Sequence, residues 1–391
     1  MCGGVSRLEI YLDNAATSHP KPQAVVDAVR RALTEDNGNP GRSGHRRALR
    51  GGRILFEARE SLMRLINAPK DGCVVFCFNC TDALNTAIKG SLRVGDHVVS
   101  TVMEHNSVLR VLKELERNGL VSLTLLEPDA GGTVPARAFE AALTPRTALA
   151  ISTHASNVTG AIQPVAAIGE AMRRRGIRYL IDGAQAAGHI PVDVQALGCS
   201  LYAFPGHKGL LGPQGTGGLY VAPDTPLRSF REGGTGSSSE SMFQPAELPE
   251  GLEAGTVNLP GIAGLLAGVE TVRARQAAIL ERERTLTQAL CEGLGAMPNV
   301  TLYTPRDPAA RVSVVSFNID GATSSAIADE LDGQGFAVRG GLHCAPGMHR
   351  ALGTLRSGAV RVSPNWQNTP EDIERLLRAV RDHSSLRRSM R

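Results

Sequence analysis

Residues 203–221 read AFPGHKGLLGPQGTGGLYV and place His207 and Lys208 directly after an apolar run that is typical of a buried strand. Five glycines follow within residues 209–218, and glycine lets the backbone approach a neighbouring group closely. A lysine in such a loop either contacts a phosphate or acts as a nucleophile toward a carbonyl carbon. A solvated lysine on an ordinary hairpin fits the same residues. The rest of the chain must therefore decide between a functional and a structural role.

The composition describes a globular protein without a strong electrostatic signature. The chain has 391 residues, of which 42% are hydrophobic and 20% charged, so it can bury a large core. Its formal net charge of +4 is small for this length and predicts no nucleic-acid partner. No apolar run reaches membrane-spanning length, and MCGGVSRLEI lacks the apolar centre of a signal peptide. We expect a cytoplasmic protein with no membrane partner.

Seven cysteines are spaced unevenly, which does not indicate a disulfide framework. Cys73, Cys77 and Cys80 are close enough in the sequence to raise the question of a metal site. Cys73 and Cys77, however, lie in or beside the apolar run CVVFCF, where small buried thiols are common. We therefore predict no metal site.

Apolar runs of strand length alternate with helical patterns through the first 220 residues. Runs that are apolar on both faces and separated by helices predict an α/β fold with a mostly parallel sheet. The expected strands start at Cys73, His97, Ser122, Ala148 and Tyr179, and the expected helices between them are Asp82–Gly90, Ser107–Asn118 and Val165–Arg175. Such sheets bind ligands beyond the carboxyl ends of their strands, so the residues after each run are the candidates.

A second, smaller α/β domain is predicted toward the C-terminus. A long helical pattern runs from residue 259 to about residue 294, and strands and helices follow it. The last helix is expected to begin at Thr369, which provides an N-cap before a proline and two acids. The predicted large cofactor-binding domain comprises residues 16–260, and the predicted small domain comprises residues 261–391 with residues 1–15.

The stretch 228–258 is rich in glycine, serine and proline and has little periodicity. Long irregular segments inside compact enzymes usually have a function or cover a partner. Met242, Phe243 and Leu248 provide apolar anchors, which argues against a disordered linker.

Five successive strand ends carry polar residues that are suited to a ligand. They are Thr81, His105, Asn157, Asp182 with Gln185, and Lys208. N–H groups at a helix start bind phosphate, and Thr81 lies at such a start, although Thr81 or Asp82 could simply cap the helix. A lone histidine such as His105 is more often a capping or core residue. A carboxylate at the end of a buried strand, as at Asp182, needs a cation or a proton donor. Their shared place at one sheet edge indicates one ligand site.

Pyridoxal phosphate requires this set of residues. Its enzymes use a lysine that bonds to the cofactor, an acid that pairs with the pyridinium nitrogen, and a ring on the pyridine face. Donors at a helix start hold the phosphate. The acid matters most, because it keeps the ring protonated and therefore able to accept electrons. The predicted cofactor is pyridoxal 5'-phosphate.

A resemblance to a known family supports this interpretation. The motifs that carry it run in family order from about residue 11 to residue 369 and read YLDNAAT, EHNSV, SNVTG, DGAQ, GHKGLLGPQGTG, EAGTVN and RGGLHCAP. This ordered set resembles the cysteine desulfurases, and RGGLHCAP resembles their group II, within the class V aminotransferase group of fold-type I enzymes. The resemblance implies a large domain with a mostly parallel sheet and a smaller C-terminal α/β domain.

The resemblance also implies roles around the cofactor ring. Lys208 would hold the cofactor covalently and, once freed, remove the substrate α-proton. Asp182 would pair with the pyridine nitrogen. Gln185 would contact the phenolic oxygen, together with Asn157. His105 would stack on the ring and move protons.

Further implied roles concern the phosphate and the assembly. Thr81 and His207 would bind the phosphate, and Asp82 belongs to the same predicted cofactor-binding set. Thr256 of EAGT would reach the phosphate of the neighbouring subunit. The resemblance therefore implies a homodimer with shared sites, which the stretch 228–258 would help to build.

The implied substrate site contains the residue that decides the reaction. Arg361 would clamp the substrate carboxylate bidentately, with Asn157 and Ala16 beside the substrate. Cys344 resembles the catalytic cysteine of group II desulfurases, and glycines and a proline nearby argue against burial in a regular element. His343 and Arg339 are expected to supply positive charge that favours the thiolate.

The implied reaction converts L-cysteine to L-alanine and leaves a persulfide on Cys344 for a sulfur-acceptor protein. A selenocysteine lyase, or another amino-acid lyase or aminotransferase of the same fold, stays open, since these enzymes could also use Lys208 and Arg361. A third hypothesis is a non-catalytic protein of this fold, and it predicts that Lys208 or Asp182 is replaced. Both residues are present. No docking motif identifies the sulfur acceptor.

The chain departs from the family pattern at two positions. Pro205 stands three residues before the lysine, where members commonly have a serine or threonine that binds the phosphate. Proline has neither a hydroxyl nor an N–H group, so one hydrogen bond of about 1–2 kcal/mol is absent. Asn106 stands where many members have a second histidine.

Overall fold

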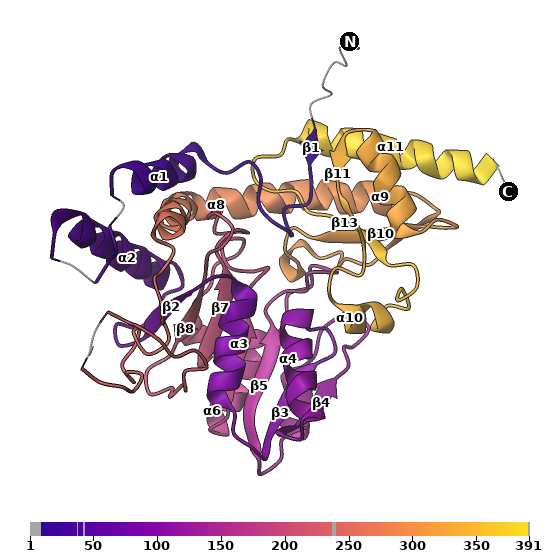
Figure 1. The fold of residues 1–391 in the computed structure, drawn as a ribbon. Helices are drawn as coiled ribbons and strands as arrows, with labels where there is room; N and C mark the ends of the chain where they lie inside the picture. The colour runs from indigo at the N-terminus through magenta and orange to yellow at the C-terminus, as the bar shows by residue number, and fades with distance from the viewer. Residues whose placement is uncertain (1–8, 37, 42–43, 237–239, 390–391) are drawn as a thin grey trace. The chain divides into compact units, whose positions relative to one another are not determined.

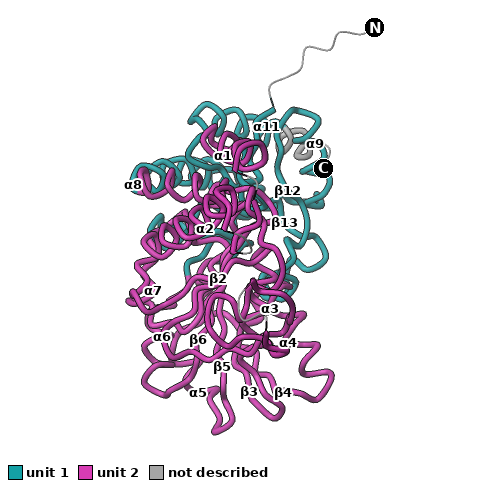
Figure 2. Tube along the Cα trace, turned by 60° about the vertical axis from the view of Figure 1, so that its left-hand side comes forward, with its two compact units in different colours: residues 1–19, 156–162, 277–391 teal, residues 20–155, 163–276 magenta. Residues whose placement is uncertain are grey.

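The computed structural model describes residues 9–36, 38–41, 44–236 and 240–389. The chain forms two compact units, each built from separate segments of the sequence (Figure 2). The large unit comprises residues 20–155 and 163–276, and the small unit comprises residues 1–19, 156–162 and 277–391.

A seven-stranded sheet forms the centre of the large unit, in the order β2-β8-β7-β6-β5-β3-β4. Its strands are β2 (Cys73–Cys77), β3 (Asp96–Thr101), β4 (Val121–Leu126), β5 (Thr147–Thr153), β6 (Arg178–Asp182), β7 (Leu201–Pro205) and β8 (Gly217–Val221). Only β8 runs antiparallel to its neighbours, and all other pairs are parallel. The predicted α/β fold with a mostly parallel sheet is confirmed.

Helices cover this sheet because its strands are apolar on both faces. The helices of the large unit include α1 (Gln23–Thr34), α2 (Arg46–Leu65), α3 (Cys80–Ser91), α4 (Asn106–Arg117), α5 (Ala136–Ala141), α6 (Val165–Arg174) and α7 (Val194–Leu197), of which α2, α3, α4 and α6 contact the strands. Helices α3 and α4 pack against each other, and α3 contacts β7 and β8 (Figure 1). Helix α6 packs on β6 beside α5. The three helices expected between the strands are therefore confirmed as α3, α4 and α6.

The glycine-rich stretch is the connection from β7 to β8. A Cβ atom on Gly209 would lie 2.4 Å from the carbonyl oxygen of Ala187, and one on Gly206 would lie 2.1 Å from Oγ1 of Thr216. These glycines therefore allow the chain to pack against itself, which positions Lys208 just beyond the end of β7.

The small unit contains a four-stranded antiparallel sheet, in the order β12-β13-β10-β9, and a parallel pair of β1 and β11. Its strands are β1 (Ile10–Tyr11), β9 (Val300–Leu302), β10 (Val315–Ile319), β11 (Phe336–Ala337), β12 (Arg339–Gly341) and β13 (Ala359–Val362). Its helices are η1 (Pro308–Ala310), α9 (Ser324–Gly333), α10 (Pro346–Ala351) and α11 (Pro370–Ser389), with the second half of α8 (Leu259–Gly295).

The start of α11 confirms the predicted N-cap. The Thr369 hydroxyl accepts a hydrogen bond from the backbone N–H of Asp372 at 3.2 Å. The Asp372 carboxylate in turn accepts one from the backbone N–H of Thr369 at 2.9 Å. This reciprocal pair satisfies two N–H groups that a helix start leaves unpaired.

The domain boundaries expected from the sequence, 16–260 and 261–391 with 1–15, stay a prediction, because compactness does not show which segments fold alone. Residues 1–8 of the predicted small domain and residues 237–239 of the irregular stretch lie outside the described residues. Among the described residues, no helix has the length and apolar character that crossing a bilayer requires.

Candidate active site

The carboxyl edge of the large sheet gathers most of the predicted site residues. Thr81 follows β2, His105 follows β3, and Lys208 follows β7. Asp182 is the last residue of β6, and Gln185 lies three residues beyond it. Because these strands all point the same way, their ends lie at one edge, as the sequence predicted. Asn157 follows β5 in the sequence but belongs to the small unit.

The side chain of Asp182 accepts hydrogen bonds from two residues of the large unit. Its Oδ1 accepts hydrogen bonds from the backbone N–H of Ala184 at 3.0 Å and from the Cys80 thiol at 3.5 Å. Burial and the nearby Asp182 raise the pKa of Cys80 well above its usual range, so the thiol stays protonated and can donate. Asp182 is only 3% exposed, and the backbone N–H of His154 donates to its carbonyl oxygen at 2.8 Å.

Cys80 is a site residue that the sequence did not reveal. Its partner Asp182 is 102 residues away in the chain, and only the parallel sheet brings the two together. The available signal was its place beside Thr81, directly after a buried strand.

Thr81 and His105 are joined through Ser107. The Thr81 hydroxyl lies 2.7 Å from Oγ of Ser107, and that oxygen lies 2.8 Å from Nδ1 of His105. The His105 side chain caps α4 by accepting from the backbone N–H of Ser107. Asn79 caps α3, which leaves Thr81 in the exposed first turn of that helix. A helix start with free N–H groups and a hydroxyl is suited to an anion.

His207 is a neutral group between two lysines. Burial, with Lys208 and Lys21 nearby, lowers its pKa to about 4, so the ring is uncharged at neutral pH. The Lys21 ammonium donates to the His207 carbonyl oxygen at 2.8 Å, and burial lowers the pKa of Lys21 to about 8. Lys21, rather than His207, is therefore charged at neutral pH.

Glu104, next to His105, is a fully buried acid. Its Oε1 accepts hydrogen bonds from the Thr101 hydroxyl at 2.6 Å and from the backbone N–H of Thr153 at 3.1 Å. Its Oε2 has no partner among the described residues. Burial raises the pKa of Glu104 to about 8, so it is protonated at neutral pH.

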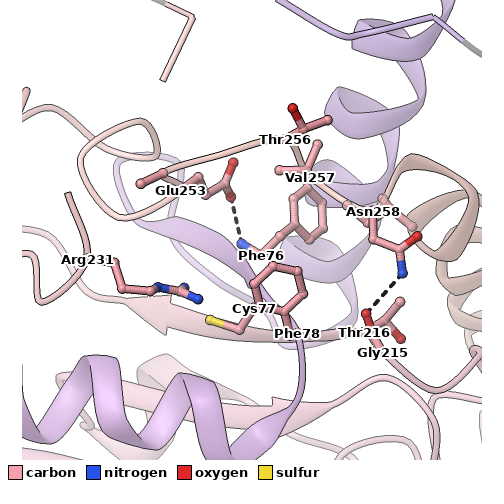
Figure 3. A pocket seen from close by; sticks show the side chains of 12 residues that line it. Phe76, Cys77, Phe78, Gly215, Thr216, Arg231, Glu253, Thr256, Val257 and Asn258 are labelled. Carbon is pink, nitrogen blue, oxygen red and sulfur yellow. Dashed lines mark hydrogen bonds between the residues drawn. The ribbon is translucent and has the colours of Figure 1, made fainter. Parts of the chain in front are cut away.

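One pocket of the large unit involves two of the predicted residues, and Figure 3 shows its lining. Thr256 lines it, while Asp82 forms an ion pair with the lining residue Arg231 at 3.2 Å. Asp82 also accepts a hydrogen bond from the backbone N–H of Phe78. Among the described residues that line this pocket, Thr256 alone belongs to the predicted cofactor set.

In the small unit, Arg361 is a buried cation with one acidic partner among the described residues. Its side chain is 2% exposed, and its Nη2 donates to Oδ1 of Asp13 at 2.8 Å. Its Nη1 donates to the backbone oxygen of Asn157 at 3.1 Å, while Nε has no partner among the described residues. Burial lowers the pKa of Arg361. Ala16, another predicted substrate residue, donates its N–H to the carbonyl oxygen of Asp13.

Cys344 is the exposed member of the six cysteines that the structure describes. The adjacent His343 is 3% exposed, and its Nε2–H donates to the carbonyl oxygen of Ala359 at 3.0 Å. Burial and the nearby Arg361 lower the pKa of His343 to about 2. The expectation that His343 supplies positive charge to the thiol is therefore wrong, because a buried ring next to an arginine stays neutral.

Comparisons with known proteins agree with this fold. The sequence model of the family described as Aminotransferase class-V matches residues 10–376. A protein of Methanothermobacter thermautotrophicus, named as a probable cysteine desulfurase, is 37% identical over 95% of this chain and 93% of its own length. The chain belongs to the class-V aminotransferase family and, within it, to the cysteine desulfurases.

Solved structures of this family superpose closely. The apo cysteine desulfurase of Thermococcus onnurineus NA1 gives a TM-score of 0.89 at 32% identity, covering 96% of this chain and 95% of that chain. A cysteine desulfurase of Escherichia coli in an S-sulfonic acid form gives a TM-score of 0.85 at 30% identity, covering 96% and 94%.

Proposed function

We propose that this protein is a pyridoxal-phosphate-dependent cysteine desulfurase that converts L-cysteine to L-alanine and carries the sulfur as a persulfide on Cys344. The observation that carries the proposal is the exposure of Cys344, since the other described cysteines are buried or partly buried. A sulfur carrier must meet first its substrate and then an acceptor, which a buried thiol cannot do.

The donor set of the large unit fits pyridoxal phosphate. Asp182 offers a buried acid at the end of β6, which is the group that a pyridinium nitrogen needs. The first turn of α3, with the Thr81 hydroxyl, suits the phosphate dianion. Lys208 follows β7 at the same edge and would hold the cofactor, with Gln185 at the phenolic oxygen and His105 on the ring. When bound, the cofactor supplies an electron sink that weakens the bonds at the substrate α-carbon.

The protein residues would then share the chemistry. Lys208, freed by the substrate amine, removes the α-proton, and Arg361 holds the substrate carboxylate. The Cys344 thiolate attacks the substrate sulfur, so that an S–S bond forms and the carbon–sulfur bond breaks. The electron pair of that bond goes to the three-carbon fragment, which is protonated and leaves as alanine. No external oxidant is needed, because the electron pair of the broken carbon–sulfur bond stays on the three-carbon fragment, and the sulfur therefore reaches the oxidation level of a persulfide.

We also propose a homodimer in which Thr256 contributes to the phosphate site of the partner. Met242 is 95% exposed and Phe243 84% exposed, and both belong to the irregular stretch that contains Thr256. Large apolar side chains at that exposure suit coverage by another protein surface. A reducing, cytoplasmic setting is part of the proposal, since the six described cysteines are all free.

The test incubates purified protein with pyridoxal phosphate, L-cysteine and dithiothreitol and follows alanine and sulfide together. We expect equal amounts of both products, a visible absorption band that Lys208→Ala removes, and, when dithiothreitol is left out, a persulfide mass increase on Cys344. Cys344→Ala should keep the absorption band and lose cysteine turnover. A colourless protein, or turnover that survives Lys208→Ala, would contradict the proposal.

The same variant separates the alternative activities. A selenocysteine lyase retains selenocysteine cleavage in Cys344→Ala, whereas an aminotransferase yields no sulfide from cysteine at all. For the dimer, mixing Lys208→Ala with Thr256→Ala subunits should restore sites that each variant lacks alone. Unchanged activity after mixing, or a monomeric mass by light scattering, argues against shared sites.

A further inference from the structure

Cys344 lies in a turn that its sequence does not favour. The backbone N–H of Ala345 donates to the carbonyl oxygen of Leu342 at 2.9 Å, which closes a four-residue turn. The two central residues, His343 and Cys344, have φ values of 48° and 58°. Positive φ at both positions defines a type I′ turn, which glycine, asparagine and aspartate dominate. Residues with larger side chains reach this region only under strain.

Two contacts to His343 hold the turn on both sides. The ring donates from Nε2 to the carbonyl oxygen of Ala359, the first residue of β13, at 3.0 Å. The carbonyl oxygen of His343 accepts from the Asn157 side-chain amide at 2.6 Å. Gly341, the last residue of β12, pairs with Ala359 in the sheet, so the turn begins directly after a strand that is paired with β13. The contacts and the sheet therefore offset the strain of the two residues.

We propose that His343 is a positioning residue that holds Cys344 in this strained turn and fixes the direction in which the thiol points. The inference rests on the proposed function, in which Cys344 is the nucleophile. Its physical basis is the buried ring, which anchors the backbone to β13 while the adjacent thiol stays exposed. Anchoring by an uncharged ring acts on the geometry of the thiol and leaves its acid–base chemistry unchanged.

This role predicts different effects for alanine and glycine at position 343. Alanine removes the ring but keeps the steric penalty of positive φ. The turn should therefore relax, and the Cys344 thiol should no longer point in a fixed direction. Glycine also removes the ring, yet it adopts positive φ without strain, so the turn should persist. We expect His343→Ala to lower kcat by about 5- to 30-fold, the population shift that one left-handed residue implies. His343→Gly should recover most of that loss, and KM for cysteine should change little in either variant.

The experiment uses the holoenzyme and two readouts. Steady-state turnover of L-cysteine gives kcat and KM, and mass spectrometry follows the alkylation of Cys344 by iodoacetamide across a pH range. We expect the alkylation profile to match the wild type in both variants, because the neutral ring does not charge the thiol. His97→Ala is the matched control, since His97 is also buried and hydrogen-bonded through its ring, to Thr147 and Thr124, and belongs to the large unit. Thermal melting of all variants checks that they fold.

Three results would overturn the inference. Equal losses of kcat in His343→Ala and His343→Gly would show that the ring does not act by holding the turn. Wild-type turnover in His343→Ala would show that no anchor is needed, and a shifted alkylation profile would show that His343 acts on the thiol chemically. Failure of the proposed function looks different, because the wild type itself would then lack turnover that depends on Cys344.

Discussion

The ion pair between Asp13 and Arg361 gives the sharpest prediction for stability. Arg361 is 2% exposed, and Asp13, 2.8 Å away, is its acidic partner among the described residues. In Asp13→Asn the amide oxygen can still accept a hydrogen bond, but the negative charge is gone. Removing one partner of a buried pair leaves an uncompensated charge, which typically lowers the free energy of unfolding by about 3–5 kcal/mol. We expect a loss in this range, nearer its lower end because Asp13 is 20% exposed.

The assay is guanidinium unfolding followed by fluorescence of Trp366, the chain's single tryptophan, which lies in the small unit with Arg361. Glu57→Gln is the matched control, because its ion pair with Arg53 lies at the surface, with side chains 45% and 80% exposed. Such pairs contribute about 0.2–1 kcal/mol. In the holoenzyme, L-alanine should restore more stability to Asp13→Asn than to the wild type, since its carboxylate can pair with Arg361.

A loss in Asp13→Asn no larger than that of the control would refute the reasoning. It would mean that, in Asp13→Asn, the Arg361 guanidinium is compensated by water or by another acid. Equal stabilisation of variant and wild type by L-alanine would separately contradict the assignment of Arg361 as the carboxylate clamp.

Three further predictions follow from single residues. Glu104 keeps its proton in the folded protein up to about pH 8, whereas an unfolded glutamate loses its proton at about pH 4.3. As the pH rises between these two values, the free energy of unfolding of the wild type should therefore fall relative to that of Glu104→Gln. Parallel pH curves of the unfolding midpoint for the two proteins would contradict this. Pro205→Ser should tighten pyridoxal phosphate binding by about 5- to 30-fold if its hydroxyl reaches the phosphate, measured by absorbance titration, and Pro205→Ala should not. Thr369→Ala should lower the unfolding free energy by about 0.5–2 kcal/mol through loss of the α11 cap, while Thr369→Ser should retain it.

The sequence predicted the large sheet well because its signals are local. The strands are apolar runs, and the two residues that cap the start of α11, Thr369 and Asp372, are three residues apart. It did not predict α1 or α2, and no pattern was assigned to those stretches. The order of strands, with β8 inserted between β2 and β7, depends on pairings between distant residues that no local pattern encodes.

The candidate site shows the same division between local and distant information. Thr81, His105 and Asp182 could be placed at one edge because parallel strands end together. Their contacts could not be foreseen, since Cys80 reaches Asp182 across 102 residues and Arg361 reaches Asp13 across 348. The charge of His343 was misjudged for a related reason. A histidine beside a cysteine looks cationic in sequence, but burial, which sequence does not show, removes the charge.

In the small unit, Asn157 connects Arg361, which is predicted to bind the substrate carboxylate, with the turn that carries Cys344. Asn157 accepts from Arg361 through its backbone oxygen and donates to the carbonyl of His343 through its side chain. A movement of Arg361 toward a substrate carboxylate would therefore act on the same residue that holds the Cys344 turn. Because both bonds belong to Asn157, substrate binding and thiol positioning should be energetically coupled. The Asn157 side chain thus has a structural role in the small unit, beside the cofactor and substrate contacts that the family resemblance implies.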